Sequence, residues 1–206
     1  MTEGIEAVIF DLGGVLVDWN PRHLYRKLFD DEAAMETFLA EICTPAWHAE
    51  IDRGRSMADS VTVLKRQYPE HAALIEAYDG RWPEMFKGTI EGSVDILEKI
   101  RDTGRPVYAL TNFPADKFES FRRSFPFVDA FKGIIVSGQE GVIKPEAEIF
   151  ERMKTRFGLN PARTLFIDDL PANVAAAQDL GFQAVRFTSP AALAHQLDTI
   201  GLVQGG

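Results

Sequence analysis

The sequence predicts an α/β protein in which a doubly wound parallel sheet carries an inserted helical segment. Three observations lead to this fold class. Short apolar runs recur along the chain with helical segments between them, as in parallel βαβ units. Residues 22–87 lack such runs and show helical spacing of apolar residues instead. The first run, at residues 7–10, is continuous rather than alternating, which is typical of a strand buried on both faces.

The first predicted strand runs directly into Asp11, and Gly13 and Gly14 then allow a sharp turn and a close approach to a ligand. Turn-forming residues at 18–21 predict a short flap or hairpin. Helical spacing follows from residue 22 to about residue 87, with breaks near residues 44–45 and 52–56. We therefore expect a core at residues 1–17 and 88–206 and a helical domain at residues 18–87.

From Glu91 onward, helices and strands alternate. The apolar runs predict further strands at residues 107–110, 133–137, 164–167 and 184–187. Helical spacing predicts helices at residues 93–101, 116–125, 146–157, 171–180 and 191–200. Gly104, Gly158 and Gly181 each stand just past a predicted helix, where glycine commonly ends one.

Composition limits the classes of function. The chain has 206 residues, of which 46% are hydrophobic, and a net charge of −9. This acidic balance argues against a general nucleic-acid or anionic-membrane binder. Cys43 is the only cysteine, so no internal disulfide can form, and we expect a reducing, cytoplasmic location. No apolar run is long enough to span a membrane.

Polar residues follow four of the predicted strands. They are Asp11, Thr111, Lys144 (one loop further on) and the pair Asp168-Asp169. Taken singly, each has an ordinary structural explanation, such as a turn residue, an exposed lysine or a helix N-cap. Because parallel strands present their carboxyl ends along one edge of the sheet, the four positions together predict a site there.

The residue types in this set indicate phosphoryl transfer. Carboxylates 4 Å apart repel by about 4 kcal/mol per pair at an effective dielectric of 20, and a divalent cation with oxygen ligands, Mg²⁺ above all, offsets that repulsion. Lys144 and the Thr111 hydroxyl can stabilise phosphoryl oxygens. One oxygen of Asp11 remains free to attack phosphorus and form an aspartyl-phosphate.

The set resembles the four motifs of the haloacid dehalogenase superfamily. The matching segments are Asp11-Leu-Gly-Gly-Val, Leu110-Thr-Asn112, Lys144-Pro145 and Phe166-Ile-Asp-Asp169. The resemblance extends to about Gly181 and implies a Rossmann-like core with an α-helical cap after the first motif. We use "the cap" for residues 18–87. Within the superfamily the likeness is greatest to the small sugar-phosphate phosphatases.

The resemblance also implies roles for individual residues. Asp11 corresponds to the nucleophile, and Thr111 and Lys144 correspond to phosphate-binding positions. The implied Mg²⁺ ligands are Asp11, the carbonyl oxygen of Gly13, Asp169 directly and Asp168 through water. Asn173, at the start of the next helix, is expected to support that loop.

We expect substrate contacts from Gly14, Asn112, Trp47 and Asp52. Trp47 and Asp52 belong to a charged and aromatic cap segment, residues 47–55, that breaks the helical pattern. For each single residue of this segment, an ordinary interhelix turn with a core tryptophan is an equally simple interpretation.

One position departs from the superfamily pattern. Related phosphatases carry an aspartate two residues after the nucleophile as a general acid, whereas this chain has Gly13. Two hypotheses remain open: the cap supplies the acid, from Asp18, His48 or Asp52, or the enzyme prefers phosphates with good leaving groups. Both predict that Gly13→Asp raises the rate on poor leaving groups.

The same residues bear on alternative functions. A 2-haloacid dehalogenase shares the nucleophile but lacks the acidic pair, and a mutase needs the acid that Gly13 replaces. In phospho-receiver domains the acidic pair precedes the phosphorylated aspartate, which excludes that class. A non-catalytic descendant that binds a phosphorylated metabolite remains an alternative. The expected partner is a small phosphorylated molecule, with no nucleic acid or membrane, and the expected state is a monomer or homodimer.

Overall fold

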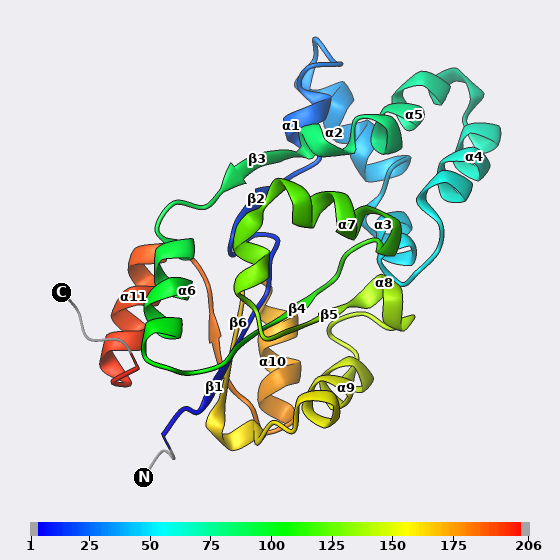
Figure 1. Cartoon of the computed structure of the whole chain (residues 1–206). Coiled ribbons are helices and arrows are strands. Elements are labelled where there is room, and N and C mark those ends of the chain that lie inside the picture. The colour runs from blue at the N-terminus through cyan, green and yellow to red at the C-terminus, as the bar shows by residue number, and fades with distance from the viewer. Residues whose placement is uncertain (1–3, 203–206) are drawn as a thin grey trace.

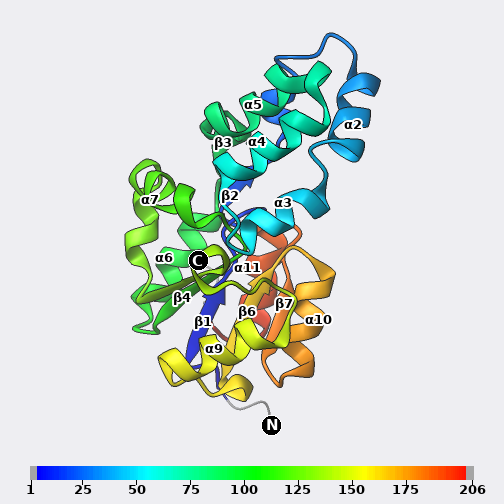
Figure 2. The ribbon, with the colours of Figure 1, turned by 90° about the vertical axis from the view of Figure 1, so that its right-hand side faces the viewer.

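The structure, a computed structural model, describes residues 4–202. A core of helices around a sheet carries a group of helices beyond one edge of that sheet (Figures 1 and 2). The strands are β1 (Ala7–Phe10), β2 (Val17–Trp19), β3 (Phe86–Thr89), β4 (Val107–Thr111), β5 (Gly133–Val136), β6 (Thr164–Asp168) and β7 (Gln183–Arg186).

The helices divide between the cap and the core. Those of the cap are α1 (Arg22–Tyr25), α2 (Glu32–Glu41), α3 (Pro45–Asp52), α4 (Met57–Gln67) and α5 (Ala72–Gly80), with 3₁₀ helices η1 (Pro69–His71) and η2 (Trp82–Met85). Those of the core are α6 (Ser93–Asp102), α7 (Ala115–Ser124), α8 (Ser137–Glu140), α9 (Ala147–Phe157), α10 (Pro171–Asp179) and α11 (Pro190–Thr199), with 3₁₀ helices η3 (Pro126–Ala130) and η4 (Pro161–Arg163). Between residues 4 and 202, every helix is too short or too polar to cross a membrane.

A five-stranded parallel sheet in the order β5-β4-β1-β6-β7 forms the centre of the core. This arrangement confirms the predicted α/β fold class, and all five strands of the sheet lie where the apolar runs predict them. Phe10 of β1 pairs with Ile167 of β6. Asp11 and Asp168 therefore follow paired residues and lie next to each other at the carboxyl edge.

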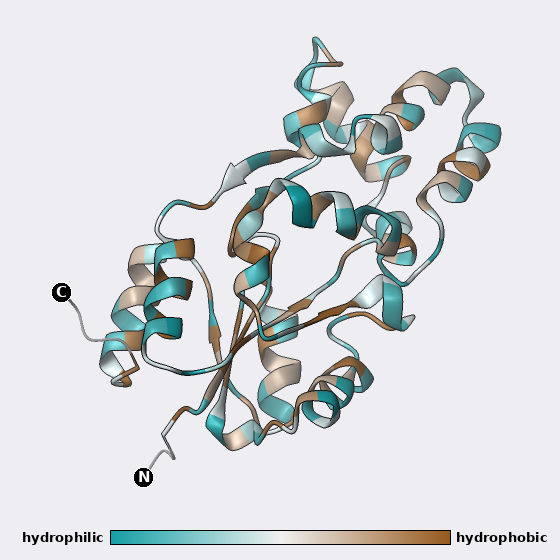
Figure 3. Ribbon diagram, in the orientation of Figure 1, coloured by the Kyte–Doolittle hydropathy of each residue, from teal (hydrophilic) through white to brown (hydrophobic). Residues whose placement is uncertain are grey.

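Both faces of the sheet are covered, which explains the continuous apolar run of β1. Val8 and Phe10 belong to a buried cluster that includes side chains of α6 and α11. Ala7 and Ile9 point to the other face and pack in a second cluster with side chains of α9 and α10. The strands accordingly form the hydrophobic centre in Figure 3.

The cap is joined to the core by a small ribbon that the sequence does not reveal. β2 and β3 pair antiparallel, with Val17 opposite Thr89, so both chain crossings into the cap run through one ribbon. The sequence predicts a local hairpin near residues 18–21 and no strand in residues 22–87. The second prediction is wrong, because β3 begins at Phe86 and pairs with β2. The local signal is weak because the partner strand lies far away in the sequence.

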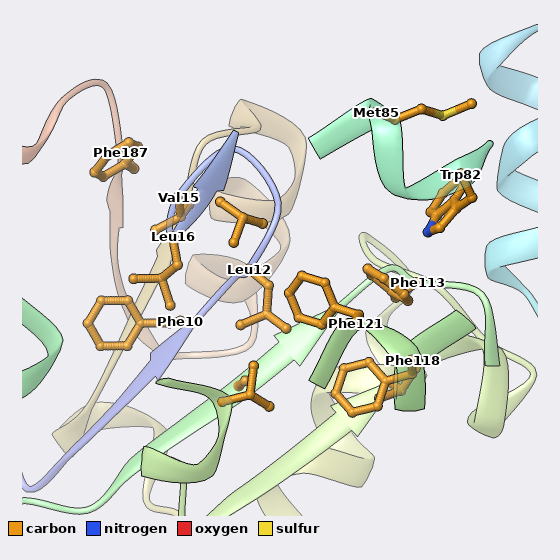
Figure 4. Close-up of a cluster of buried hydrophobic side chains, with 14 of the residues drawn as sticks. Phe10, Leu12, Val15, Leu16, Trp82, Met85, Phe113, Phe118, Phe121 and Phe187 are labelled. Atoms are coloured by element: carbon orange, nitrogen blue, oxygen red, sulfur yellow. The ribbon is translucent and has the colours of Figure 1, made fainter. Parts of the chain in front are cut away.

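The first buried cluster continues from the sheet into the cap. Leu12, Val15 and Leu16, in the loop after β1, belong to the same cluster as the sheet residue Phe10 and the cap residues Trp82 and Met85, and Phe113 and Phe121 lie between the loop and Trp82 (Figure 4). The cap therefore packs on the core through apolar contacts as well as through the ribbon.

Close backbone contact fixes the end of α3 against α8. Gly54, with φ +113°, approaches Gly138 so closely that a Cβ on Gly54 would lie 2.8 Å from the Gly138 carbonyl oxygen. A Cβ on Gly138 would lie 2.5 Å from the Ala115 amide nitrogen and 2.8 Å from the Phe113 carbonyl oxygen. The atoms that either Cβ would meet belong to the main chain, so they cannot make room without a shift of the backbone.

We therefore predict that Gly138→Ala lowers the free energy of unfolding by about 1–3 kcal/mol, because the added methyl group meets main-chain atoms. Urea denaturation measures this change. Gly80→Ala is the matched control, since a Cβ at Gly80, the last residue of α5, meets nothing within 4 Å and alanine favours helix. An equally small effect of both substitutions would contradict the close contact.

Candidate active site at the carboxyl edge of the sheet

Lys144 lies at the centre of a charged cluster at the carboxyl edge of the sheet. Its Nζ lies 2.9 Å from Oδ1 of Asp11 and 2.8 Å from Oδ2 of Asp168. It also donates a hydrogen bond of 2.9 Å to the carbonyl oxygen of Leu110. The Lys144 side chain is only 1% exposed, so these three acceptors can take all three of its donors. The ammonium group thus joins the ends of β1, β4 and β6.

Asp168, the last residue of β6, is completely buried. Besides its contact with Lys144, it accepts a hydrogen bond of 2.9 Å from the Leu170 N–H and bonds of 3.0 Å to both oxygens from the Asn173 side-chain amide. Asn173 stands in the first turn of α10, where Pro171 favours the start of a helix. Asp168 therefore points into the protein, whereas its neighbour Asp169 lines the cavity described below.

Asn112 fixes the backbone that carries Lys144. Its side-chain amide donates to the Lys144 carbonyl oxygen at 3.0 Å, and its Oδ1 accepts from the Lys144 N–H at 2.8 Å. This reciprocal pair joins the loop after β4 to the loop after α8. The sequence predicts Asn112 as a substrate ligand. It does line the cavity, but its amide group is engaged with Lys144, so its contacts are those of a residue that orients the lysine.

Three carboxylates gather here around a single ammonium group. Asp11, Asp168 and Asp169 each offer an oxygen, and these oxygens lie within 4.8 Å of one another. Gly14, with φ +74°, comes so close that a Cβ there would lie 2.6 Å from Oδ2 of Asp169. The close spacing of oxygen ligands and their excess negative charge fit a hard divalent cation such as Mg²⁺. The carbonyl oxygen of Gly13, whose residue also lines the cavity, is available as a further oxygen ligand.

The charges of the cluster shift the pKa values of its members. Burial raises the pKa of Asp11 to about 7; Lys144 opposes this rise and Asp168 adds to it. Burial and the charge of Asp168 also raise the pKa of Asp169. Burial by itself lowers the pKa of Lys144, but Asp11 and Asp168 outweigh it and raise that pKa above its ordinary value. Lys144 therefore remains protonated, and added positive charge would favour ionised Asp11.

A cavity of about 310 Å³ opens between the charged cluster and the cap. Its floor is polar and its upper walls are largely aromatic. The floor consists of Asp11, Gly13, Gly14, Asn112, Lys144, Asp169 and Asn173. The walls consist of Trp19, His48, Asp52, Trp82, Phe86, Phe113, Pro114 and Leu170. Of the predicted site residues, Thr111 and Asp168 are buried beneath the floor and do not line the cavity.

Residues 47–52 of the cap segment that the sequence predicts to be irregular belong to the helix α3, whereas residues 53–55 lie in the predicted break before α4. Thr44 accepts a hydrogen bond from the Trp47 N–H, and Pro45 occupies the first turn, so the helix has a regular start. His48 and Asp52 are four residues apart, share one helix face and both line the cavity. Trp47 points elsewhere: its ring packs edge-on against Tyr78, 5.0 Å away, and it lines a separate groove with residues of α4. The expected contact of Trp47 with substrate therefore has no support in its position.

Sequence reasoning missed two tryptophans. Trp19 of β2 and Trp82 of η2 line the cavity next to His48, with ring centroids 5.1 Å and 5.6 Å from the His48 ring and 5.8 Å from each other. Both pairs are stacked. No local pattern marks these residues, because the two segments lie far apart in the sequence and meet only where β2 pairs with β3, next to η2.

Comparisons with known proteins agree with this architecture. A sesquiterpene phosphatase of Aspergillus oryzae is 28% identical over 203 residues, which cover 96% of this chain and 97% of that protein. The D-ribitol-5-phosphate phosphatase of Bacteroides thetaiotaomicron is 25% identical over 196 residues, or 87% of this chain and 90% of that protein.

Among solved structures, a haloacid dehalogenase family enzyme from Bacteroides thetaiotaomicron, in complex with magnesium and inorganic phosphate, shares the fold with a TM-score of 0.72. It is 24% identical, and the match covers 90% of this chain and 96% of that one. The family model of the haloacid dehalogenase-like hydrolases matches residues 5–181. The chain therefore belongs to the haloacid dehalogenase-like hydrolases.

Proposed function

We propose that this hydrolase is a Mg²⁺-dependent phosphomonoesterase that acts through an aspartyl-phosphate on a small phosphorylated metabolite. The observation that carries the proposal is the cluster of Asp11, Asp168 and Asp169 near Lys144, from which Asp11, Asp169 and Lys144 line the cavity. The phosphatase names of the two relatives above support the same reaction class.

Asp11 is the proposed nucleophile. Its carboxylate lies at the cavity floor, where Oδ1 both contacts Lys144 and accepts the N–H of Leu12, so Oδ2 is the oxygen proposed for the attack. Attack on phosphorus transfers the phosphoryl group to Asp11, and Lys144 stabilises the negative charge that gathers on the phosphoryl oxygens. Water then hydrolyses the aspartyl-phosphate. Thr111 remains a predicted phosphate ligand from the resemblance.

The predicted metal ligands are Asp11, the Gly13 carbonyl oxygen and Asp169 directly, and Asp168 through water. Bound Mg²⁺ would supply positive charge that offsets the carboxylates and polarises the phosphoryl group. A haloacid dehalogenase reaction, the first alternative, attacks carbon and has no use for so many carboxylates beside the nucleophile. The acidic pair therefore favours attack on phosphorus.

We propose a sugar phosphate as the substrate class. The tryptophan rings of the walls offer apolar faces, yet their Nε1 atoms are buried and have no hydrogen-bond partner within residues 4–202. A leaving group with an apolar face packs against these rings, as one face of a sugar ring does. A terpenyl phosphate, suggested by the Aspergillus oryzae relative, would also pack against these rings and is the alternative substrate class.

We predict that Asp11→Asn lowers phosphate release from p-nitrophenyl phosphate and sugar phosphates by at least about 10³-fold, because the amide is a poor nucleophile. Assays with Mg²⁺ and with EDTA measure this, and wild-type turnover should require the metal. Asp18→Asn is the control, since Asp18 pairs with His23 at 2.9 Å and does not line the cavity. Turnover that survives Asp11→Asn would contradict the mechanism.

We also predict that Mg²⁺ stabilises the folded protein by about 2.7 kcal/mol at a concentration 100 times its dissociation constant, since only the folded chain assembles the ligands. Thermal unfolding with and without Mg²⁺ measures the shift. Asp169→Asn should remove most of it, and Asp18→Asn should leave it intact. An equal shift in Asp169→Asn would place the metal elsewhere.

A further inference from the structure

We propose that Asp52, carried by the cap helix α3, is the general acid and base of the reaction. It takes the role that related phosphatases give to an aspartate at the position of Gly13. The proposal rests on the phosphatase function proposed above and assigns a catalytic role to a cap residue. Three observations carry it: the position of Asp52 in the wall of the cavity, the missing partner of its carboxyl oxygen, and the contacts that hold it over the floor.

The reaction needs a proton donor that the loop after β1 does not supply. Gly13 lines the cavity but has no side chain, and a Cβ at this position would meet nothing within 4 Å. An alcohol leaving group departs slowly as an alkoxide, and a positioned acid speeds such a step by about 10²–10⁴-fold. The acid must therefore come from another residue that lines the cavity.

Of the three cap residues considered as the general acid, Asp18 and His48 are unsuitable. The Asp18 side chain is 43% exposed, pairs with His23 and lies outside the cavity. His48 lines the cavity, but burial lowers its pKa to about 4. Its imidazole is therefore neutral near pH 7 and has no readily released proton. These facts leave Asp52.

Asp52 has the surroundings of a protonated carboxyl group. Its side chain is 11% exposed, and its Oδ1 has no hydrogen-bond partner in the part of the chain that the structure describes. The nearest base, Nε2 of His48, lies 3.4 Å from that oxygen. Burial, helped by the charge of Asp11 and opposed by Lys144, raises the pKa of Asp52 to about 8. Tyr78, whose own pKa is raised by burial, adds no charge near pH 7.

The core holds Asp52 in place from two sides. The Ser137 hydroxyl, at the start of α8, donates to the Asp52 carbonyl oxygen at 2.6 Å and accepts the Phe113 N–H at 2.9 Å. The next residue, Arg53, donates to Glu146 at 2.9 Å, only two residues from Lys144. The cap acid and the lysine of the floor are thus tied to the same loop.

In the proposed mechanism, Asp52 first gives up one proton and then regains it. Asp11 attacks phosphorus, the bond from phosphorus to the leaving oxygen breaks, and that oxygen takes the electron pair and the proton of the Asp52 carboxyl group. The alcohol leaves, and Asp52 is now a carboxylate. Asp52 then takes a proton from water as the water oxygen attacks phosphorus. The bond to Asp11 breaks, phosphate is released, and both aspartates regain their starting states.

The test compares benzyl phosphate with p-nitrophenyl phosphate. Both carry one aromatic ring, but only the nitrophenolate leaves readily without a proton. We expect Asp52→Asn to lower kcat for benzyl phosphate by about 10²–10⁴-fold and kcat for p-nitrophenyl phosphate by less than about tenfold. Asp18→Asn, the matched control, should change neither. Circular dichroism and the Mg²⁺-dependent thermal shift establish that the variants fold and retain the floor of the site.

A second variant tests whether Asp52 acts as an acid and not only as a structural residue. Because the space beside Gly13 is open, Gly13→Asp in the Asp52→Asn background should restore benzyl phosphate turnover by at least about tenfold, through an acid at the alternative position. Equal losses on both substrates, or no loss on either, would overturn the role of Asp52, as would a wild type that hydrolyses only p-nitrophenyl phosphate. A wild type that releases phosphate from neither substrate with Mg²⁺ would overturn the phosphatase function itself, and this role with it.

Discussion

The ion pairs of Lys144 are the interaction on which the rest of the site depends. Burying Asp11 and Asp168 side by side is costly unless a cation accompanies them, and removing one partner of a buried pair costs about 3–5 kcal/mol. Lys144 reaches both carboxylates because Asn112 holds its backbone and Asn173 holds Asp168. The ends of three strands are thereby fixed around one ammonium group, and the negative charge that remains fits a divalent cation.

The cap completes what the core lacks. The core supplies the proposed nucleophile, a lysine and an acidic pair, but Gly13 supplies no proton donor. The cap closes the cavity with aromatic walls and brings His48 and Asp52 from one face of α3 to its inner surface. Burial under these walls shifts the pKa values of the two side chains in opposite directions, because burial disfavours the charged form of each. The histidine is therefore neutral, and the aspartate retains its proton. Desolvation by the cap thus prepares an acid near neutral pH.

The core could be predicted because its local patterns are strong, whereas contacts between distant segments leave no local pattern. The five strands of the sheet are short apolar runs, and the residues that follow them are enough to place Asp11, Lys144 and the acidic pair at one edge. β3 escapes prediction because it pairs with β2 across the whole cap. Trp47, predicted to contact substrate, lies away from the cavity, because Thr44-Pro45 starts a regular helix instead of breaking one and this helix packs the Trp47 ring against Tyr78.

The most direct test of this account is to trap the phosphorylated enzyme. The protein would be mixed with Mg²⁺ and ³²P-labelled acetyl phosphate, quenched in acid within milliseconds and digested for peptide mass spectrometry. The account predicts acid-stable, hydroxylamine-sensitive label on Asp11 that is absent in Asp11→Asn. Phosphate release without any labelled enzyme, or label on another residue, would contradict the central role of Asp11 and of the charged cluster built around it.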